Sequence, residues 1–404
     1  MPKADKDEKF DIVVGIPSYN EAPTIGFVAE QASEGLAYHF PDKKSIIVNV
    51  DNHSSDNTKE AFLNAKTSVE KKYISTPKDV RGKGHNFLNL FKYAVDVDAH
   101  TVIVVDADLK SINKDWMDLL GRPVKEGYDF VTPLYTRHQF DGSITNHICY
   151  PTVFGLLRHD IRQPIGGDFA LSSKLVKHLL EQKWTGCVKQ YGIDIFLTMN
   201  AILGDFKICQ TSLGKKAHNA SAPKLGIMFE QVIESLLDIL VANKDKWMTG
   251  GSIDDIITPK IYGDASMPEP QGLEIDVRDL KEKCNASYRE YLPYIQEVLG
   301  PYAVSRIANM FRMDFFNLDV LLWTQIFYNL VYRYDNIRDE SDKKKIINTL
   351  KPLYFARSLT FNYHTWKFNI RYAEEEVREQ ALGFATQRYY LWGLYGCPDN
   401  TMQT

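Results

Sequence analysis

The feature that most constrains this chain is an uninterrupted apolar run at residues 102–105 that ends in two acids, Asp106 and Asp108. A continuous β-branched run is typical of a strand buried on both faces, as in a parallel sheet. In open α/β sheets, ligands bind beyond the carboxyl ends of the strands, where both acids fall. Two carboxylates on a tight turn suit Mg²⁺ or Mn²⁺, although capping of a following helix would also explain them.

Three apolar segments before this run, at residues 11–17, 45–51 and 72–75, are predicted strands that alternate with amphipathic stretches. A helix is expected over residues 24–38, and another ends near Val95. This alternation predicts an α/β fold with a mainly parallel sheet covered by helices, whose strand ends share one edge. Four strands would thus end in polar clusters at one site.

Among these clusters, the stretch from Arg81 to Gly84 is rich in glycine. Lys83 could reach a phosphate there, with the flanking glycines letting the backbone approach closely. An ordinary exposed turn explains the same residues equally well. The first turn lacks the Gly-x-Gly-x-x-Gly pattern of a dinucleotide-binding sheet, and the chain has no Walker-type Gly-Lys-Ser/Thr.

Later motifs add candidate residues with open alternatives. Gly166 and Gly167 before Asp168 indicate either a backbone close to a ligand or a tight structural bend. Asp194 falls in the first turn of a predicted helix, where the helix dipole favours an acid regardless of function. His218 follows a further short strand, and a lone loop histidine is more often a surface residue than a ligand.

The composition is that of an ordinary globular protein, with 44% hydrophobic and 25% charged residues. A net charge of −4 without a basic block argues against nucleic acid or an anionic membrane as partner. Five scattered cysteines indicate reduced thiols. With no signal-peptide pattern and no long apolar run, we expect a soluble cytoplasmic protein.

The pattern changes from residue 227 onward, where helical periodicity dominates. We predict an α/β domain at residues 1–248, a connection at 249–271 and a helical domain at 272–404. The many aromatics of the last domain indicate helix packing or, alternatively, a subunit interface. We therefore expect a homo-oligomer.

Taken together, the ordered motifs resemble those of a known enzyme family. Residues 16–21, Asp51 with Ser55 and Asp56, residues 81–84 and the Asp106-Ala-Asp108 turn resemble GT-A glycosyltransferases that use nucleotide-sugars. The later motifs at residues 163–168, 191–194 and 214–218 resemble retaining mannosylglycerate and glucosylglycerate synthases and the related glucosyl-3-phosphoglycerate synthases. The helical tail, with the motif at residues 313–317, looks most like mannosylglycerate synthase.

The resemblance implies a role for each matching residue. Asp108 and His218 would ligand Mg²⁺ or Mn²⁺, with Asp106 contacting the metal or the donor. Asp194 would lie at the reacting centre, and with Asp106 it is the predicted catalytic pair. The implied nucleotide-sugar-binding residues are Pro17, Asn20, Glu21, Asp51, Lys83, Asp106, Ala107, Gly166 and Gly167.

The acceptor side departs from the family pattern. Mannosylglycerate synthase has an arginine just after the strand at residues 128–131, where this chain has Thr132. A carboxylate acceptor still needs a partner, and Arg137 is the expected substitute because a bidentate arginine is the strongest one at neutral pH. The predicted acceptor-binding residues are Arg137, Thr132, Asp168 and Asp194.

The resemblance thus implies retaining transfer of glucose or mannose from a GDP- or UDP-sugar to D-glycerate, which would form a compatible solute. A synthase that uses 3-phosphoglycerate is the nearest alternative, and a polymer-elongating or protein-directed glycosyltransferase is another. A nucleotidyltransferase would also use a nucleotide, a metal and paired carboxylates. A non-catalytic sugar-nucleotide sensor would bind the donor without turnover.

Overall fold

The chain divides into two compact, interleaved units. Unit 1 comprises Met1–Thr136, Arg162–Ser235 and Pro259–Gln271, and unit 2 comprises Arg137–Ile161, Leu236–Thr258 and Gly272–Thr404. Their bounds differ from the single break predicted between residues 248 and 272. The computed structural model describes residues 8–217, 225–264, 266, 268–270, 272–273 and 276–396.

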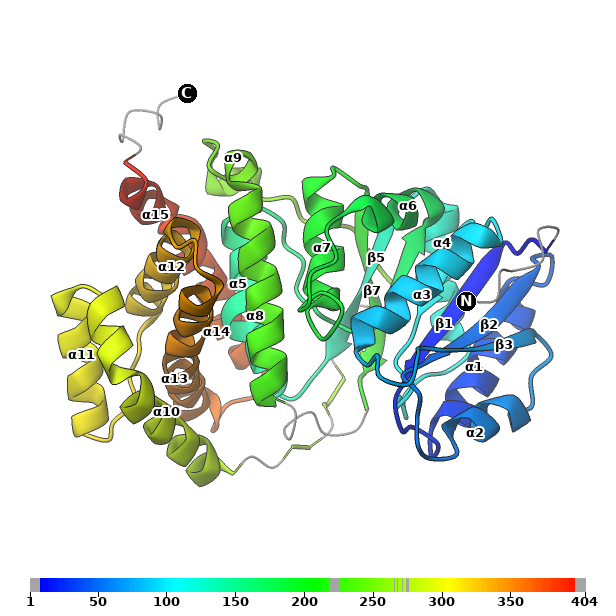
Figure 1. Cartoon of the computed structure of the whole chain (residues 1–404), viewed down its shortest axis with the longest axis horizontal. Coiled ribbons are helices and arrows are strands. Elements are labelled where there is room, and N and C mark those ends of the chain that lie inside the picture. The colour runs from blue at the N-terminus through cyan, green and yellow to red at the C-terminus, as the bar shows by residue number, and fades with distance from the viewer. Residues whose placement is uncertain are drawn as a thin grey trace. The chain divides into compact units, whose positions relative to one another are not determined.

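Unit 1 is built on an eight-stranded sheet in the order β3-β2-β1-β4-β6-β5-β7-β8. The strands are β1 (Ile12–Ser18), β2 (Ser45–Asp51), β3 (Glu70–Ser75), β4 (Thr101–Val104), β5 (Phe130–Thr136), β6 (Phe169–Ser172), β7 (Ile208–Lys215) and β8 (Ile261–Tyr262). Among the described strands, only β6 runs antiparallel to its neighbours, β4 and β5. The predicted mainly parallel α/β fold is confirmed (Figure 1).

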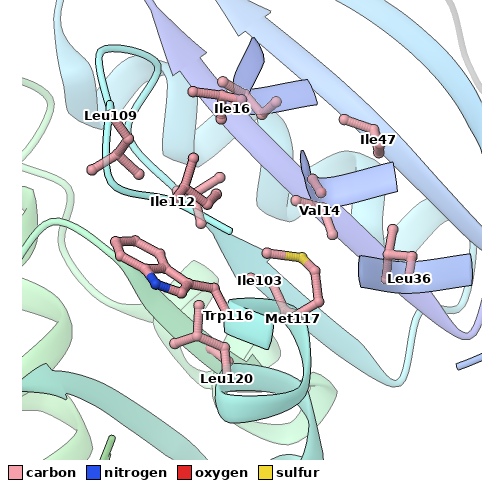
Figure 2. Close-up of a cluster of buried hydrophobic side chains, with 14 of the residues drawn as sticks. Val14, Ile16, Leu36, Ile47, Ile103, Leu109, Ile112, Trp116, Met117 and Leu120 are labelled. Atoms are coloured by element: carbon pink, nitrogen blue, oxygen red, sulfur yellow. The ribbon is translucent and has the colours of Figure 1, made fainter. Parts of the chain in front are cut away.

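Helices cover both faces of this sheet. The helices that lie in unit 1 are α1 (Ile25–His39), α2 (Thr58–Asn64), α3 (Lys83–Asp96), α4 (Asp115–Lys125), α6 (Ser173–Glu181) and α7 (Ile193–Leu203), and α8 (Leu225–Ala242) crosses the boundary between the units at residues 235/236. Side chains from β1 and β4, such as Val14 and Ile103, share a buried cluster with Leu36 of α1 and Trp116 of α4 (Figure 2). Helix α3 packs on the opposite face.

Gly15 of β1 explains the close approach of α3. A Cβ at this position would lie 2.1 Å from Leu90 Cδ2, so only glycine leaves room for the leucine. β1 and β4 are buried along their whole length, as their β-branched sequences predict. Because β1 to β4 run parallel to one another, their carboxyl ends meet at one edge of the sheet, as expected.

Unit 2 is helical. It contains the π-helix η1 (Thr145–Cys149), α5 (Tyr150–Gly155), α9 (Lys244–Trp247), the 3₁₀-helix η3 (Ile253–Asp255), α10 (Val277–Val298), α11 (Pro301–Arg312), α12 (Val320–Asn336), α13 (Glu340–Thr365), α14 (Ile370–Thr386) and α15 (Arg388–Leu394). Tyr150 and Phe154 of α5 pack with Phe361 of α13 and Val377 of α14. The predicted helical C-terminal region is therefore confirmed.

Two short strands, β6 and β8, were not predicted from the sequence. β6 spans four residues of sequence FALS, without the β-branched run that marks the other central strands. β8 spans two residues within the segment that we expected to be a connection. Within the described residues, no helix is both long enough and apolar enough to cross a membrane.

Candidate functional site

Asp51 ends β2 and is almost fully buried. Its carboxylate accepts hydrogen bonds from Ser18 Oγ (2.7 Å), from Ser54 N and Oγ (2.7 and 2.6 Å) and from Tyr73 OH (3.0 Å). Burial and the neighbouring Asp51 charge raise the pKa of the Tyr73 phenol to about 12. Asp51 therefore fixes the loop after β2, and a ligand hydroxyl would have to replace one of its present donors.

The turn after β1 is fastened to that same loop. Asn20 has a φ of +58°, in the left-handed region that asparagine tolerates. Its N–H donates to Ser54 Oγ (2.8 Å), and its Oδ1 accepts from Ser55 N (2.9 Å). Glu21 N donates to Thr58 Oγ1 (2.8 Å). These contacts bring together, at one edge of the sheet, four residues that were predicted to bind the nucleotide-sugar: Pro17, Asn20, Glu21 and Asp51.

Lys83 is the first residue of α3, and the glycines on either side of it have a structural use. A Cβ on Gly82 would lie 2.3 Å from Lys189 O, and a Cβ on Gly84 would lie 1.9 Å from Val188 O. The backbone of residues 188–190, which leads into α7, therefore packs against both glycines. The contact of Lys83 with a phosphate stays a prediction.

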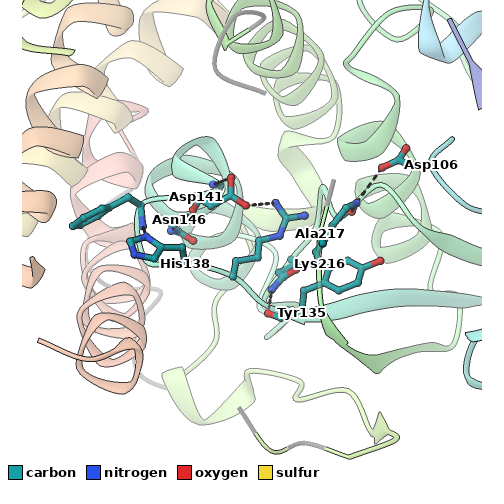
Figure 3. A network of polar contacts seen from close by, with 12 residues as sticks. Asp106, Tyr135, His138, Asp141, Asn146, Lys216 and Ala217 are labelled. Carbon is teal, nitrogen blue, oxygen red and sulfur yellow. Dashed lines mark hydrogen bonds and ion pairs between the residues drawn. The ribbon is translucent and has the colours of Figure 1, made fainter. Parts of the chain in front are cut away.

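Five charged side chains meet beyond β4. Lys83 Nζ lies 3.0 Å from Asp106 Oδ1 and 3.4 Å from Asp194 Oδ1. Lys216 Nζ lies 3.0 Å from Asp106 Oδ2 (Figure 3). It also lies 2.7 Å from Asp168 Oδ2. Asp106 is thus held by an ammonium group on each oxygen. Because two cations face three carboxylates, the cluster carries an excess of negative charge.

Burial and pairing act in opposite directions on these groups. Burial would raise the pKa of Asp106, but Lys83 and Lys216 hold it well below its usual range. Burial would lower the pKa of Lys83, but Asp106 and Asp194 raise it instead. For Asp194, burial prevails and its pKa is raised. The cluster therefore combines a carboxylate that is strongly paired, Asp106, with a carboxyl group, Asp194, whose burial is poorly compensated.

Asp194 lies in the first turn of α7 and is 92% buried, since its relative exposure is 8%. Its Oδ1 approaches Lys83 at 3.4 Å but has no hydrogen-bond donor among the described residues. A buried carboxylate oxygen without a donor is energetically costly unless a ligand supplies one. This oxygen is suited to accept a hydrogen bond from a hydroxyl group.

Asp168 has no exposed surface, and it connects several parts of the site. Its Oδ1 accepts from the backbone N–H of Asp106 (2.8 Å), and its Oδ2 accepts from the Tyr135 hydroxyl. Gly167, with a φ of +92°, has no room for a side chain, because a Cβ there would lie 2.4 Å from Asp106 Oδ2. A Cβ on Gly166 would lie 2.2 Å from Pro133 Cγ. Close packing thus accounts for both glycines, and their predicted contact with the nucleotide-sugar stays a prediction.

Asp108 lies half-buried in the turn after β4, beyond the buried Ala107. The same turn is joined to the end of β7: Lys110 N donates to Ala217 O (2.8 Å), and Ala217 N donates to Ser111 Oγ (3.0 Å). His218 is the next residue in the chain, and it lies outside the described residues. Within those residues, no group of three or more His, Cys, Asp or Glu side chains is placed to hold a metal ion.

The two remaining acceptor candidates lie in different units. Thr132 is fully buried in β5, so its hydroxyl is closed to ligands in this conformation. Its Oγ1 has no hydrogen-bond partner among the described residues. Arg137 is the first residue of unit 2, where its Nη1 lies 3.6 Å from Asp141 Oδ2. Their acceptor roles stay predictions.

Sequence reasoning did not assign positions in this cluster to Lys216 or Tyr135. The only sequence signal for Lys216 is its place two residues before His218, in the motif at residues 214–218. Tyr135 had no signal beyond its position near the end of a strand. Both residues act through partners far away in the chain, and a single sequence does not reveal such contacts.

Comparison with known proteins identifies part of the chain. Residues 53–225 match the family model of the glycosyltransferase domain of mannosylglycerate synthase. The matched segment includes Lys83, the Asp-Ala-Asp turn, Asp194 and His218. The resemblance to mannosylglycerate synthases stated from the sequence is therefore confirmed over this segment. No curated protein matches the chain.

Solved structures of one enzyme are also similar to this chain. Glucosyl-3-phosphoglycerate synthase from Mycobacterium tuberculosis, in complex with Mn²⁺, UDP and glucosyl-3-phosphoglycerate, is 25% identical; the match covers 57% of this chain and 80% of that one, with a TM-score of 0.47. The same enzyme with Mg²⁺ and UDP is 25% identical over 57% and 79% of the two chains, also with a TM-score of 0.47.

Proposed function

We propose that this protein is a retaining glycosyltransferase that transfers glucose or mannose from a GDP- or UDP-linked donor to D-glycerate. The observation that carries the proposal is the match of residues 53–225 to the mannosylglycerate synthase domain, because the charged cluster of the structure is built almost wholly from that segment. The product would be a compatible solute made in the cytoplasm.

In this proposal the donor lies at the carboxyl edge of β1 to β4. Pro17, Asn20, Glu21 and Asp51 surround the base and ribose. Lys83 faces the diphosphate: its side chain keeps 20% of its surface exposed, and among the described residues its ammonium group makes two carboxylate contacts, at 3.0 and 3.4 Å. An ammonium has three N–H donors, so Lys83 can add a phosphate oxygen to its present partners.

The residues present fit a divalent metal ion at Asp108 rather than at Asp106. Both oxygens of Asp106 are paired with lysines, so a metal there would have to displace an ammonium group. Asp108 offers hard oxygens. Ala217, the residue before His218, is hydrogen-bonded to the same turn. A carboxylate and an imidazole suit Mn²⁺ or Mg²⁺. When bound, the ion would neutralise the departing diphosphate.

Asp194 is the proposed residue at the reacting centre. Its Oδ1, which Lys83 Nζ approaches only at 3.4 Å, can accept a hydrogen bond from a hydroxyl of the sugar or of the acceptor, which would orient that group for transfer. The excess negative charge of the cluster would also stabilise positive charge that develops at the anomeric carbon. Asp106 contributes to this negative charge while it holds Lys83 in place.

The charge distribution favours D-glycerate over 3-phosphoglycerate. A phosphorylated acceptor needs additional cations, but Lys216 is buried against Asp106 and Asp168, and Arg137 lies beside Asp141. A carboxylate acceptor asks for only one cationic partner. Turnover with 3-phosphoglycerate and not with D-glycerate would replace this part of the proposal.

The test is a transfer assay with Mn²⁺ or Mg²⁺, the four donor combinations of GDP or UDP with glucose or mannose, and either acceptor. We expect a glycoside of D-glycerate and release of nucleoside diphosphate with retention of anomeric configuration. Release of pyrophosphate would indicate a nucleotidyltransferase, and donor binding without turnover would indicate a sensor. Either result would overturn the proposal.

A pair of variants tests the metal assignment. Asp108→Ala should lose all metal-dependent transfer while its circular dichroism spectrum stays unchanged, and His218→Ala should behave in the same way. The matched control is Asp98→Ala, since Asp98 is an exposed acid before β4, at the opposite end of the same strand. Full activity of Asp108→Ala would refute the metal site.

We also propose that the protein forms a homo-oligomer. Several large apolar side chains of unit 2 are exposed within that unit, among them Met313, Phe315, Trp366 and Phe368. Exposed aromatic side chains of this size are typical of subunit interfaces. A monomer in light scattering at assay concentration would refute this.

A further inference from the structure

Lys216 differs sharply from its neighbour in the chain. Lys215 ends β7 and is exposed, whereas the side chain of Lys216 keeps only 4% of its surface exposed. A lysine is rarely buried to this extent unless its charge is fully paired. The position of its partners therefore defines what this residue does.

Among the described residues, the ammonium group of Lys216 has three acceptors, one for each of its N–H bonds. It donates to Asp106 Oδ2 (3.0 Å), to Gly166 O (2.9 Å) and to Asp168 Oδ2 (2.7 Å). Because an ammonium group carries three donors, none is left for a ligand in this arrangement. Lys216 is therefore placed to hold protein groups rather than to bind a phosphate.

The acceptors of Lys216 belong to two separate turns. Asp106 begins the turn after β4, and Gly166 and Asp168 belong to the turn before β6. A second link joins the same turns, because Asp106 N donates to Asp168 Oδ1. Gly167 completes the junction, since any side chain there would meet Asp106 Oδ2 at 2.4 Å and Lys216 Nζ at 3.0 Å.

We propose that Lys216 is a positioning residue that locks these two turns together and keeps Asp106 out of the coordination of a divalent ion. This inference rests on the proposed function and adds a role that the family match does not assign. With Lys216 in place, Asp106 uses Oδ2 for the lock and Oδ1 for Lys83. The ion is then confined to the side of Asp108.

Removing the charge should have a specific effect on metal binding. In Lys216→Met, the Oδ2 atom of Asp106 loses its cation, and Asp106 and Asp108 can serve one ion together. An additional carboxylate ligand strengthens binding of a hard divalent cation. We expect Mn²⁺, followed by electron paramagnetic resonance without nucleotide, to bind at least about tenfold more tightly than to the unmodified protein.

Catalysis should change in the opposite direction. The loosened turn no longer presents Asp106 to Lys83, so we expect kcat to fall by about a hundredfold or more while the KM for the donor changes much less. Lys215→Met is the matched control, because it removes an equal charge from the adjacent exposed position. It should leave both Mn²⁺ affinity and kcat unchanged.

A merely structural role for Lys216 would lower the unfolding temperature without increasing Mn²⁺ affinity, and that result would overturn the proposal. If Lys216→Met fails to fold, the double variant Lys216→Met/Asp168→Asn carries the same test. The Asp168→Asn substitution removes the carboxylate that lost its partner, while the amide oxygen that replaces it can still accept from Asp106 N or from the Tyr135 hydroxyl.

The design separates this proposal from the proposed function. Isothermal titration with UDP-glucose and GDP-mannose tests donor binding by the unmodified protein, and absence of binding would refute the glycosyltransferase assignment alone. The Mn²⁺ measurement needs neither donor nor acceptor. Equal Mn²⁺ binding by Lys216→Met and the unmodified protein would refute the role of Lys216 whatever the donor result.

Discussion

Gly167→Ala is expected to be much more damaging than Gly127→Ala, although both glycines have nearly the same φ. The angle is +92° at Gly167 and +96° at Gly127, so alanine meets a comparable backbone penalty at each position. A Cβ at position 127 has no heavy atom within 4 Å, whereas one at position 167 would lie 2.4 Å from Asp106 Oδ2. The pair separates backbone strain from a side-chain collision.

The magnitudes follow from these distances. A non-glycine residue in the left-handed region costs about 1–2 kcal/mol, which is the whole effect expected for Gly127→Ala. At position 167 the carboxylate must also move away from Lys216, and loss of a hydrogen bond between charged groups costs about 1.5–3 kcal/mol more. We therefore expect a total loss of about 2.5–5 kcal/mol for Gly167→Ala.

Urea unfolding of the two variants, followed by circular dichroism, measures this difference. Gly127→Ala should also retain transferase activity, because it lies after α4 and away from the charged cluster. Gly167→Ala should lose activity even in conditions where it is folded. Equal destabilisation of the two variants, or full activity of Gly167→Ala, would show that the junction of the two turns is not as tight as argued.

Three further outcomes are expected. Tyr135→Phe removes the hydroxyl that donates to Asp168 and should lower the free energy of unfolding by about 1–3 kcal/mol in urea titrations; an unchanged midpoint would contradict this. Because the pKa of Tyr73 is raised to about 12, the folded state holds this proton more tightly than the unfolded chain, so its contribution to stability is complete below about pH 10 and is lost as pH rises toward 12. Tyr73→Phe should accordingly remove one late step from the absorbance titration at 295 nm, and loss of an early step would refute the assignment. In unit 2, Arg357→Met leaves the buried Gln380 Oε1 without its donor, so the free energy of unfolding should fall by about 1–3 kcal/mol and the melting temperature should fall with it. An unchanged melting temperature would indicate that Gln380 finds another partner.

Much of the sheet follows from local sequence. β1 and β4 are apolar over most of their length, and β2 is interrupted only by Asn49 before its polar end; the polar ends of the three strands meet at one edge because parallel strands share a direction. β6 escaped prediction because it is short and reversed, so its site residue, Asp168, precedes the strand instead of following it. A rule that looks for ligands after strands does not reach such a residue.

The charged cluster shows a second limit. Lys83, Asp106 and Asp194 were singled out near predicted element ends and Asp168 by the two glycines before it, and the structure brings the four residues together. Which residue pairs with which was not predictable, because the partner of Asp106 that completes the cluster, Lys216, lies 110 positions away in the chain. Spacing in sequence carries no information on contacts at this range.

The interleaving of the two units has a consequence for how the protein is made. A ribosome releases the chain from its N-terminus, and all segments of unit 1 have been synthesised once residue 271 has been added. η1 and α5, although made early, must wait for α13 and α14 before Tyr150 and Phe154 find their apolar partners. During that interval these side chains are exposed to the chaperones and proteases that act on nascent chains. A shortened chain that ends before α14 would keep this exposure permanently, so the C-terminal helices protect a segment synthesised some two hundred residues earlier, as the separation of Tyr150 and Val377 shows.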